Sequence, residues 1–262
     1  MMEAFGPGTA TAPYERYYAS GHYDRRYPRP NPRVLRFILS ALPPAGHVID
    51  FGCGSGRYLL ALRDRVAVAA GYDICAAALE RLQLSAARLG CADHLLAVGP
   101  DPAELDRHVA RHGRADVVLC LFGVLSHIES AAARAEALRR MTALLRPGSG
   151  RLILSVPNRH RRFRSEQRAQ GAADGEIRYV RQLRDMALPM SYKLFDLDSL
   201  RTELARAGLQ IETLRAESLV PETLVANSPV MRTFDRLTTP LLPAGLGYGI
   251  LAVARPAALA SA

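Results

Sequence analysis

Short apolar runs alternate with amphipathic stretches along most of the chain. In the amphipathic stretches apolar residues recur every three or four positions, which is typical of helices that cover one face of a sheet. A parallel sheet buried on both faces produces this alternation, because its strands read as continuous apolar runs. The runs that predict strands are 48–51, 66–72, 94–99, 116–122, 151–158, 209–215 and 246–254.

Local start and stop signals bound the predicted helices. Asn31 followed by Pro32 is a typical N-cap and first-turn pair, and it predicts a helix over 33–42. Pro147 and Gly148 end a later helix directly before a strand. Strands and helices therefore alternate, which predicts an α/β fold.

The first predicted strand leads into a glycine-rich turn. Its acid, Asp50, is followed by Gly52, Gly54 and Gly56, and an amphipathic helix begins at Arg57. Glycines at these places let a ligand lie on the backbone, and a helix N-terminus offers free N–H groups to an anion. Arg57 stands where the dinucleotide fingerprint has its last glycine, so this is a different motif. The loop alone leaves two interpretations open, a nucleotide-type cofactor site and a plain strand–helix turn.

Further elements extend the pattern in a fixed order. The spacing Asp-x-Gly-x-Gly-x-Gly at 50–56 resembles the first motif of class I S-adenosylmethionine-dependent methyltransferases. The segment 121–128 resembles the end of that family's fourth strand, and the Pro-Gly turn resembles its Pro-Gly-Gly turn, with Ser149 in place of the second glycine. The resemblance covers 31–158 and 197–256. It implies a Rossmann-like, doubly wound, seven-stranded sheet.

The resemblance also implies S-adenosyl-L-methionine as the cofactor, with no metal. Asp73 ends the second strand, where an acid can hold both ribose hydroxyls. Asp101 is the candidate for the adenine amino group, although it comes one residue later than usual and follows a proline that can misplace its carboxylate. The implied cofactor-binding residues are Asp50, Gly52, Cys53, Gly54, Gly56, Asp73, Ile74, Asp101 and Leu121.

Candidate acceptor residues lie in less patterned parts of the chain. The segment 14–27 holds five of the ten tyrosines, and in related small-molecule methyltransferases the N-terminal segment folds over cofactor and substrate. Tyr23 or Tyr27 then faces the ligands, or packs this segment onto the core. Asn158 can position a substrate, and Arg159 or Arg161 can clamp a carboxylate or phosphate. A solvated basic loop is the alternative for these arginines.

His127 is the candidate general base, because it follows the fourth strand and its ring titrates near neutral pH. A packing or helix-capping role is the alternative. Methyl transfer needs mainly the alignment of donor and acceptor and the exclusion of water. A hydroxyl or protonated amine acceptor also needs a base, whereas a carboxylate does not.

The predicted domain organisation is simple. Residues 1–30 form an N-terminal tail and cap segment, with 1–12 expected to be disordered, and 257–262 form a C-terminal tail. Residues 31–256 form a single methyltransferase domain. Two insertions decorate it, at about 159–192 and about 216–245, the second an apolar hairpin. Such decorations select the substrate, while the core loops bind the cofactor.

Composition and cysteine spacing indicate the kind of compartment in which the protein is expected to work. The hydrophobic content of 49% supplies a two-layered core, and neither a membrane span nor a signal peptide is recognisable. Cysteines lack C-x-x-C spacing, which favours reduced, buried thiols and a cytoplasmic enzyme. The four are Cys53, Cys75, Cys91 and Cys120.

The net charge of +9 is a weak indication of nucleic-acid binding. Lys193 is the only lysine among 34 basic residues, so the charge is almost all arginine, which points to coding bias. Much of the arginine falls on predicted helices as an ordinary solvated face.

Three functions remain to be weighed. The leading hypothesis is a methyltransferase for a small metabolite or natural product, with an acidic acceptor as one option. The second is an RNA methyltransferase, because 192–195 resembles enzymes that methylate carboxymethylated wobble uridine in tRNA. The third is a non-catalytic scaffold, against which the intact glycine loop and Asp73 argue. The sequence leaves the oligomeric state and the acceptor atom open.

Overall fold

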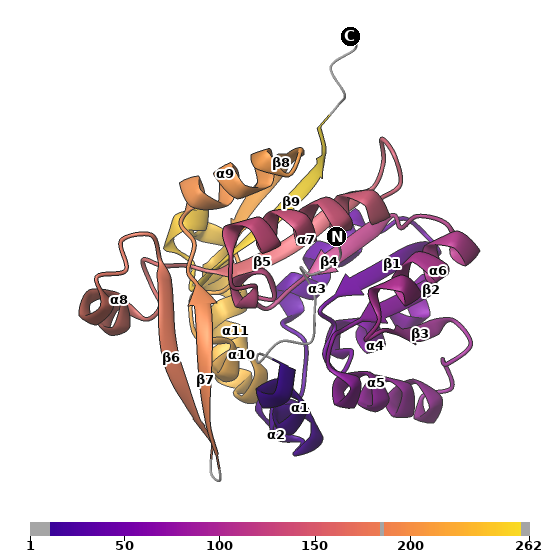
Figure 1. Cartoon of the computed structure of the whole chain (residues 1–262), viewed down its shortest axis with the longest axis horizontal. Coiled ribbons are helices and arrows are strands. Elements are labelled where there is room, and N and C mark those ends of the chain that lie inside the picture. The colour runs from indigo at the N-terminus through magenta and orange to yellow at the C-terminus, as the bar shows by residue number, and fades with distance from the viewer. Residues whose placement is uncertain (1–10, 184–185, 258–262) are drawn as a thin grey trace.

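The computed structural model describes residues 11–183 and 186–257. Its centre is a seven-stranded sheet with the order β3-β2-β1-β4-β5-β9-β8 (Figure 1). Strands β1 to β5 pair in parallel, and β9 runs antiparallel to both β5 and β8. The predicted Rossmann-like, doubly wound fold is confirmed. The strands are β1 (Gly46–Phe51), β2 (Val66–Tyr72), β3 (Leu95–Val98), β4 (Val117–Cys120), β5 (Arg151–Pro157), β8 (Leu209–Ala216) and β9 (Gly249–Pro256).

Helices cover both faces of this sheet, and each face has its own apolar core. One core joins the sheet to α6, α7 and α9, and the other joins it to α3, α4 and α5. Every residue of β1 is buried, as a central strand covered on both sides requires. The helices are α3 (Pro32–Ala41), α4 (Arg57–Leu62), α5 (Ala76–Arg88), α6 (Pro102–His112), α7 (Ala131–Leu144) and α9 (Leu197–Arg206).

Capping explains where several helices begin. The Asn31 side chain accepts a hydrogen bond from the Arg33 amide while Pro32 occupies the first turn, as the sequence predicts. At the start of α9, Asp196 and Ser199 form a reciprocal capping box. Helix α7 ends directly before the Pro-Gly turn that was expected to stop it.

Three additions surround the carboxyl ends of the parallel strands (Figure 1). The first is the N-terminal cap, made of α1 (Thr11–Ala19) and α2 (His22–Arg26). The second follows β5 and contains α8 (Arg164–Gln170) and a two-stranded sheet of β6 (Glu176–Leu183) and β7 (Met186–Lys193), which was not predicted. The third follows β8 and is a helical hairpin of α10 (Glu222–Asn227) and α11 (Pro229–Thr238).

Some sequence predictions concern chain ends and thiols. Residues 1–10 and 258–262 lie outside the described residues, whereas residues 11 and 12 begin α1 instead of being disordered. All four cysteines are buried and free, as expected. Within the described ranges, the helices lack the length and apolar character needed to cross a bilayer.

Candidate active site

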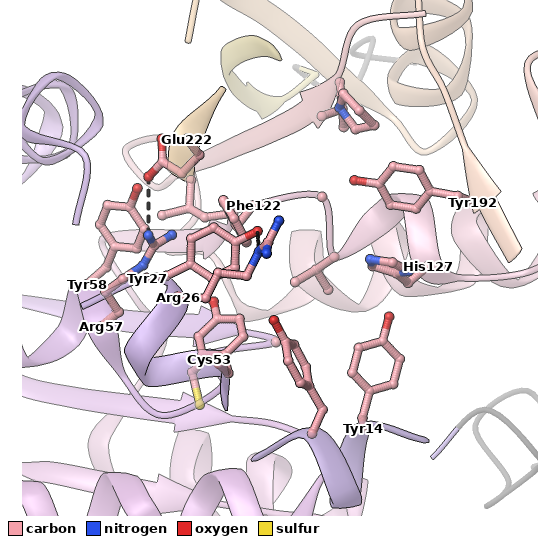
Figure 2. A pocket seen from close by; sticks show the side chains of 18 of the residues that line it. Tyr14, Arg26, Tyr27, Cys53, Arg57, Tyr58, Phe122, His127, Tyr192 and Glu222 are labelled. Atoms are coloured by element: carbon pink, nitrogen blue, oxygen red, sulfur yellow. Dashed lines mark hydrogen bonds and ion pairs between the residues drawn. The ribbon is translucent and has the colours of Figure 1, made fainter. Parts of the chain in front are cut away.

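A cavity of about 440 Å³ opens where the three additions meet the carboxyl ends of the strands. Figure 2 shows Arg57, Tyr58 and Glu222 at one end of it and Tyr14, His127 and Tyr192 at the other. The lining includes most of the predicted cofactor residues, namely Asp50, Gly52, Cys53, Asp73, Ile74 and Leu121. The parts of the chain that resemble the methyltransferase motifs therefore converge on one site.

The glycine loop between β1 and α4 requires its glycines. Gly52, Gly54 and Gly56 have φ angles of 82°, 54° and 80°, which L side chains rarely adopt. A Cβ atom would also meet Val124 at Gly52, the Tyr18 hydroxyl at Gly54 and Leu82 at Gly56. The absence of side chains lets Val124, Tyr18 and Leu82 pack directly against the loop. Gly56 also leaves the first amides of α4 without a side-chain cap.

Asp73 holds this loop in place. Its Oδ2 accepts a hydrogen bond from the Gly54 amide at 2.8 Å, and its Oδ1 accepts one from the Cys75 amide at 2.9 Å. Burial raises the pKa of the Asp73 carboxyl, while these amide donors act in the opposite direction. Each carboxylate oxygen keeps a second lone pair for a ligand. The position suits the predicted contact with two ribose hydroxyls.

Asp50 is the second acid of the cofactor end. It is almost fully buried at the carboxyl end of β1. Burial is the main cause that raises its pKa to about 7, the neighbouring Asp73 raises it further, and Arg57 lowers it. The two carboxyl groups make this part of the cavity attractive to a cation.

Asp101 has a different place from the one predicted. It is the N-cap of α6, and its Oδ1 accepts a hydrogen bond from the Ala103 amide at 2.9 Å. Its side chain is more than half exposed and does not line the described cavity. A short carboxylate before a helix bonds readily to the first-turn amides, which explains why it turns away from the ligand site. The structure does not bring Asp101 to the cavity. The apolar Ile74 lines it instead, with 43% of its surface exposed.

The tyrosine-rich N-terminal cap closes the cavity from above the loop. The five tyrosines of the cap and the residue after it all line the cavity, which matches the first of the two interpretations open for Tyr23 and Tyr27. They are Tyr14, Tyr17, Tyr18, Tyr23 and Tyr27. The cap is attached to the cofactor end itself. The Glu15 carboxylate accepts hydrogen bonds from the Ala76 and Ala77 amides at the start of α5, and the Ser55 hydroxyl of the glycine loop donates to Asp24.

His127 lies at the far end of the cavity from Glu222 (Figure 2). Its ring packs edge-on against Tyr14 at 5.5 Å and at a tilt against Tyr192 at 4.5 Å between centroids. It therefore lines the cavity, as a base would, within an aromatic cluster.

Three predicted substrate residues do not line this cavity. Asn158 is fully buried, and its amide donates to the carbonyls of Gly245 and Gly247 at 2.7 and 2.8 Å. Arg159 pairs with Asp196 at 3.3 Å, and Arg161 donates to the Leu246 carbonyl. Each of these side chains fastens one segment of the fold to another, because it bonds to nearby backbone or to an acid.

Arg162, the next residue of the same basic run, does enter the cavity. Its guanidinium lies over the rings of Phe163, Tyr192 and Tyr248 at 5.0 to 5.6 Å. Burial acts to lower its pKa, but the neighbouring tyrosines and Glu217 outweigh burial and the pKa rises. Arg162 therefore stays charged inside the site.

A buried charge cluster at the end of the cavity opposite His127 was also not predicted from the sequence. The Arg57 guanidinium contacts Glu222 at 3.2 Å and lies over the rings of Phe122 and Tyr58. Glu222 also accepts a hydrogen bond from the Asn31 side chain. Glu217 lines the cavity nearby, and an acid directly after the sixth strand was the only sequence signal for it.

The backbone is strained in the turn after β4, which borders the cavity. Phe122 has a φ of 61°, which is unusual for a bulky residue, and its amide donates to the Ser155 hydroxyl at 2.8 Å. Gly123 also has a positive φ, and a Cβ there would meet the Tyr192 hydroxyl. The turn brings Phe122 and Val124 to the ligand side of the sheet.

The residues present fit the predicted cofactor. The glycine loop leads into helix-start amides without a side-chain cap, Asp73 supplies hydrogen-bond acceptors, and Asp50 supplies a second buried carboxyl group whose ionised form a cationic ligand would favour. This fold and this loop define a class I S-adenosylmethionine-dependent methyltransferase. A family model described as a methyltransferase domain matches residues 23–214, and the chain belongs to that family. The protein is an enzyme, with S-adenosylmethionine as its cofactor.

Solved methyltransferase structures show the same fold. The CcbJ methyltransferase from Streptomyces caelestis superposes with a TM-score of 0.62 at 18% identity, covering 88% of this chain and 91% of that one. CalS10, an amino pentose methyltransferase from Micromonospora echinaspora, gives a TM-score of 0.53 at 18% identity, covering 85% and 89%. Such identities establish the fold.

A relative found by sequence is a tRNA methyltransferase. The mouse tRNA (carboxymethyluridine(34)-5-O)-methyltransferase ALKBH8 is 34% identical over 139 residues, which is 51% of this chain. The match spans only 18% of that protein's length. It concerns part of the domain and does not determine the acceptor.

Proposed function

We propose that the protein methylates a small-molecule acceptor, a metabolite or natural product, in the cavity under the N-terminal cap. The enclosure of this cavity by three additions carries the proposal. Tyr23 and Tyr27 of the cap, Tyr192 of β7 and Glu222 of α10 all line it. Its volume of about 440 Å³ lies in the range of small-molecule sites, about 300 to 1,000 Å³.

An acidic acceptor is not required by the charges of the cavity wall. Arg26, Arg57 and Arg162 line the cavity together with Asp50, Asp73, Glu217 and Glu222, so carboxyl groups accompany the cations. The idea of a clamp by Arg159 or Arg161 loses its geometric support. Within this proposal, His127 remains a candidate base at the far end of the cavity, and Tyr23 remains a candidate substrate contact.

A tRNA acceptor is the second candidate, favoured by the partial likeness to ALKBH8. The segment that suggested it contains Tyr192, which lines the cavity, and Lys193, which donates to the Asp174 carbonyl at 2.6 Å. Lys193 is thus engaged within the protein.

Two measurements test the proposed function. Calorimetry with S-adenosylhomocysteine should show binding at micromolar concentration, and the absence of binding would overturn the enzyme assignment for this site. Methyl transfer to a panel of small molecules and to total tRNA then separates the two acceptor classes. RNA binding that collapses as salt rises would favour tRNA, because phosphate contacts release counterions.

A further inference from the structure

Glu217 occupies a position that the cofactor site does not use. It follows β8, and its backbone amide donates to the Gly249 carbonyl of β9 at 2.9 Å. A Cβ atom at Gly249 would meet the Glu217 carboxylate, so the carboxylate lies against bare backbone where β5 ends and β9 begins. From there it lines the cavity. The contact requires glycine at the first residue of β9.

Ser155 connects this carboxylate to the turn after β4. Its hydroxyl accepts the Phe122 amide proton at 2.8 Å. The same hydroxyl lies close enough to Glu217 to lower the pKa of that carboxyl group. Phe122 directly follows Leu121, a predicted cofactor contact. Glu217 therefore lies near the cofactor end of the cavity.

Charged groups from three other elements face Glu217. Glu222 of α10 is a like charge, while Arg162 after β5 and Arg57 of α4 are opposite charges. Burial is the main cause that raises the pKa of Glu217 to about 7, Glu222 raises it further, and Ser155 and the two arginines lower it. A carboxyl group poised near neutral pH suits proton transfer in both directions.

The same charges discriminate between acceptors. An ammonium group would meet Arg57 and Arg162 as well as the two glutamates, and a carboxylate would meet Glu217 and Glu222 as well as the two arginines, so neither charge gains a clear net attraction that offsets its desolvation. A neutral hydroxyl has a smaller desolvation cost and can donate its proton to the Glu217 carboxylate. We propose that Glu217 is the catalytic base of an O-methyltransferase, and that the acceptor is a neutral, hydroxyl-bearing small molecule. This inference rests on the proposed function and specifies its acceptor.

The proton balance is simple. When bound, S-adenosylmethionine supplies a methyl carbon on a cationic sulfur, and the electron pair of the carbon–sulfur bond leaves with the sulfur. The acceptor O–H bond breaks, its proton passes to a Glu217 oxygen, and its electron pair stays on the acceptor oxygen for the new O–C bond. Glu217 then returns the proton to solvent.

A binding experiment tests this without knowledge of the natural acceptor. The probe is 4-nitrophenol, a phenol that ionises near neutral pH, added to protein saturated with S-adenosylhomocysteine. Calorimetry in buffers of different ionisation enthalpy counts the protons exchanged on binding. If the phenol donates to the Glu217 carboxylate, the complex holds one proton shared by the pair.

At about pH 5.5 both free groups are protonated, so the wild-type protein should release about one proton on binding. Glu217→Gln should bind the probe without this release. Glu222→Gln should show a smaller release, because loss of the like charge lowers the pKa of Glu217. His127→Gln should release the proton as the wild type does. Release that persists in Glu217→Gln, or vanishes in His127→Gln, would overturn the assignment.

Probes of other charge test the acceptor class. Benzylamine and benzoate should bind at least tenfold more weakly than 4-nitrophenol, and the reverse order, or no binding of the phenol, would overturn the hydroxyl assignment. With an accepted substrate, Glu217→Gln should lower kcat by about 10²-fold or more and remove its rise near pH 7. If S-adenosylhomocysteine still binds when these tests fail, the assignment of Glu217 and of the hydroxyl acceptor is wrong while the proposed function stands.

Discussion

Asp50 should make the folded protein less stable as the pH rises. Its pKa is about 7 in the folded protein against an ordinary value of 3.8, mainly because it is buried beside Asp73. The folded state therefore keeps a proton that the unfolded state has already lost. The stability that this proton supplies is present at low pH and is lost as the pH rises towards the folded pKa.

The size of the effect follows from the two pKa values. The difference between 3.8 and about 7 corresponds to about 4 kcal/mol, at about 1.4 kcal/mol for each pH unit. The contribution changes only below the folded pKa of about 7. An assay from about pH 5 to about pH 8 therefore covers roughly two pH units of this change, or about 3 kcal/mol. Asp50→Asn keeps the shape of the side chain and removes its titration. As the pH rises over this range, the free energy of unfolding of the variant should increase by about 3 kcal/mol relative to that of the wild type.

Urea unfolding of both proteins without ligand measures the difference at each pH. Glu217 titrates in the same range, but it is present in both proteins and cancels in the difference. Asp64→Asn, on an exposed side chain, controls for the substitution itself. A difference between Asp50→Asn and wild type that stays constant from pH 5 to pH 8 would refute the reasoning.

Three further substitutions test the site. Asp73→Ala should weaken binding of S-adenosylhomocysteine more than tenfold, because the loop loses its anchor and the ligand loses two acceptors; unchanged affinity in calorimetry would contradict the assigned pocket. Asp101→Ala should cost about 1 kcal/mol of unfolding free energy through the lost cap and leave that affinity unchanged, so a large loss of affinity would restore the adenine contact. His127→Ala should keep cofactor affinity and, with Glu217 as the base, should slow methyl transfer far less than Glu217→Gln does; a loss as large as that of Glu217→Gln would make His127 the base.

The cofactor half of the site was readable from the sequence because it depends on backbone. Positive φ angles and a helix start require glycines at fixed spacing, so Gly52, Gly54 and Gly56 indicate the loop. Asp73 was predictable because adjacent parallel strands end at the same edge of the sheet. The cap at Asn31 and the order of the strands followed from equally local rules.

The acceptor half was not readable in the same way. Asp101 and Asn158 have short polar side chains, and such side chains bond to nearby backbone as easily as to a ligand. Glu217 and Arg162 enter the cavity because distant segments pack together, which no local spacing records. The strand pair β6–β7 lies in a polar insertion whose pattern predicted no strand.

The attachment of the N-terminal cap to the glycine loop has a consequence for the order of events in a catalytic cycle. The Tyr18 hydroxyl lies at the place where a Cβ of Gly54 would be, and Asp24 accepts the hydroxyl proton of Ser55. A ligand that lies on the loop therefore also lies beneath the cap. We expect the cap to lift before the spent cofactor departs.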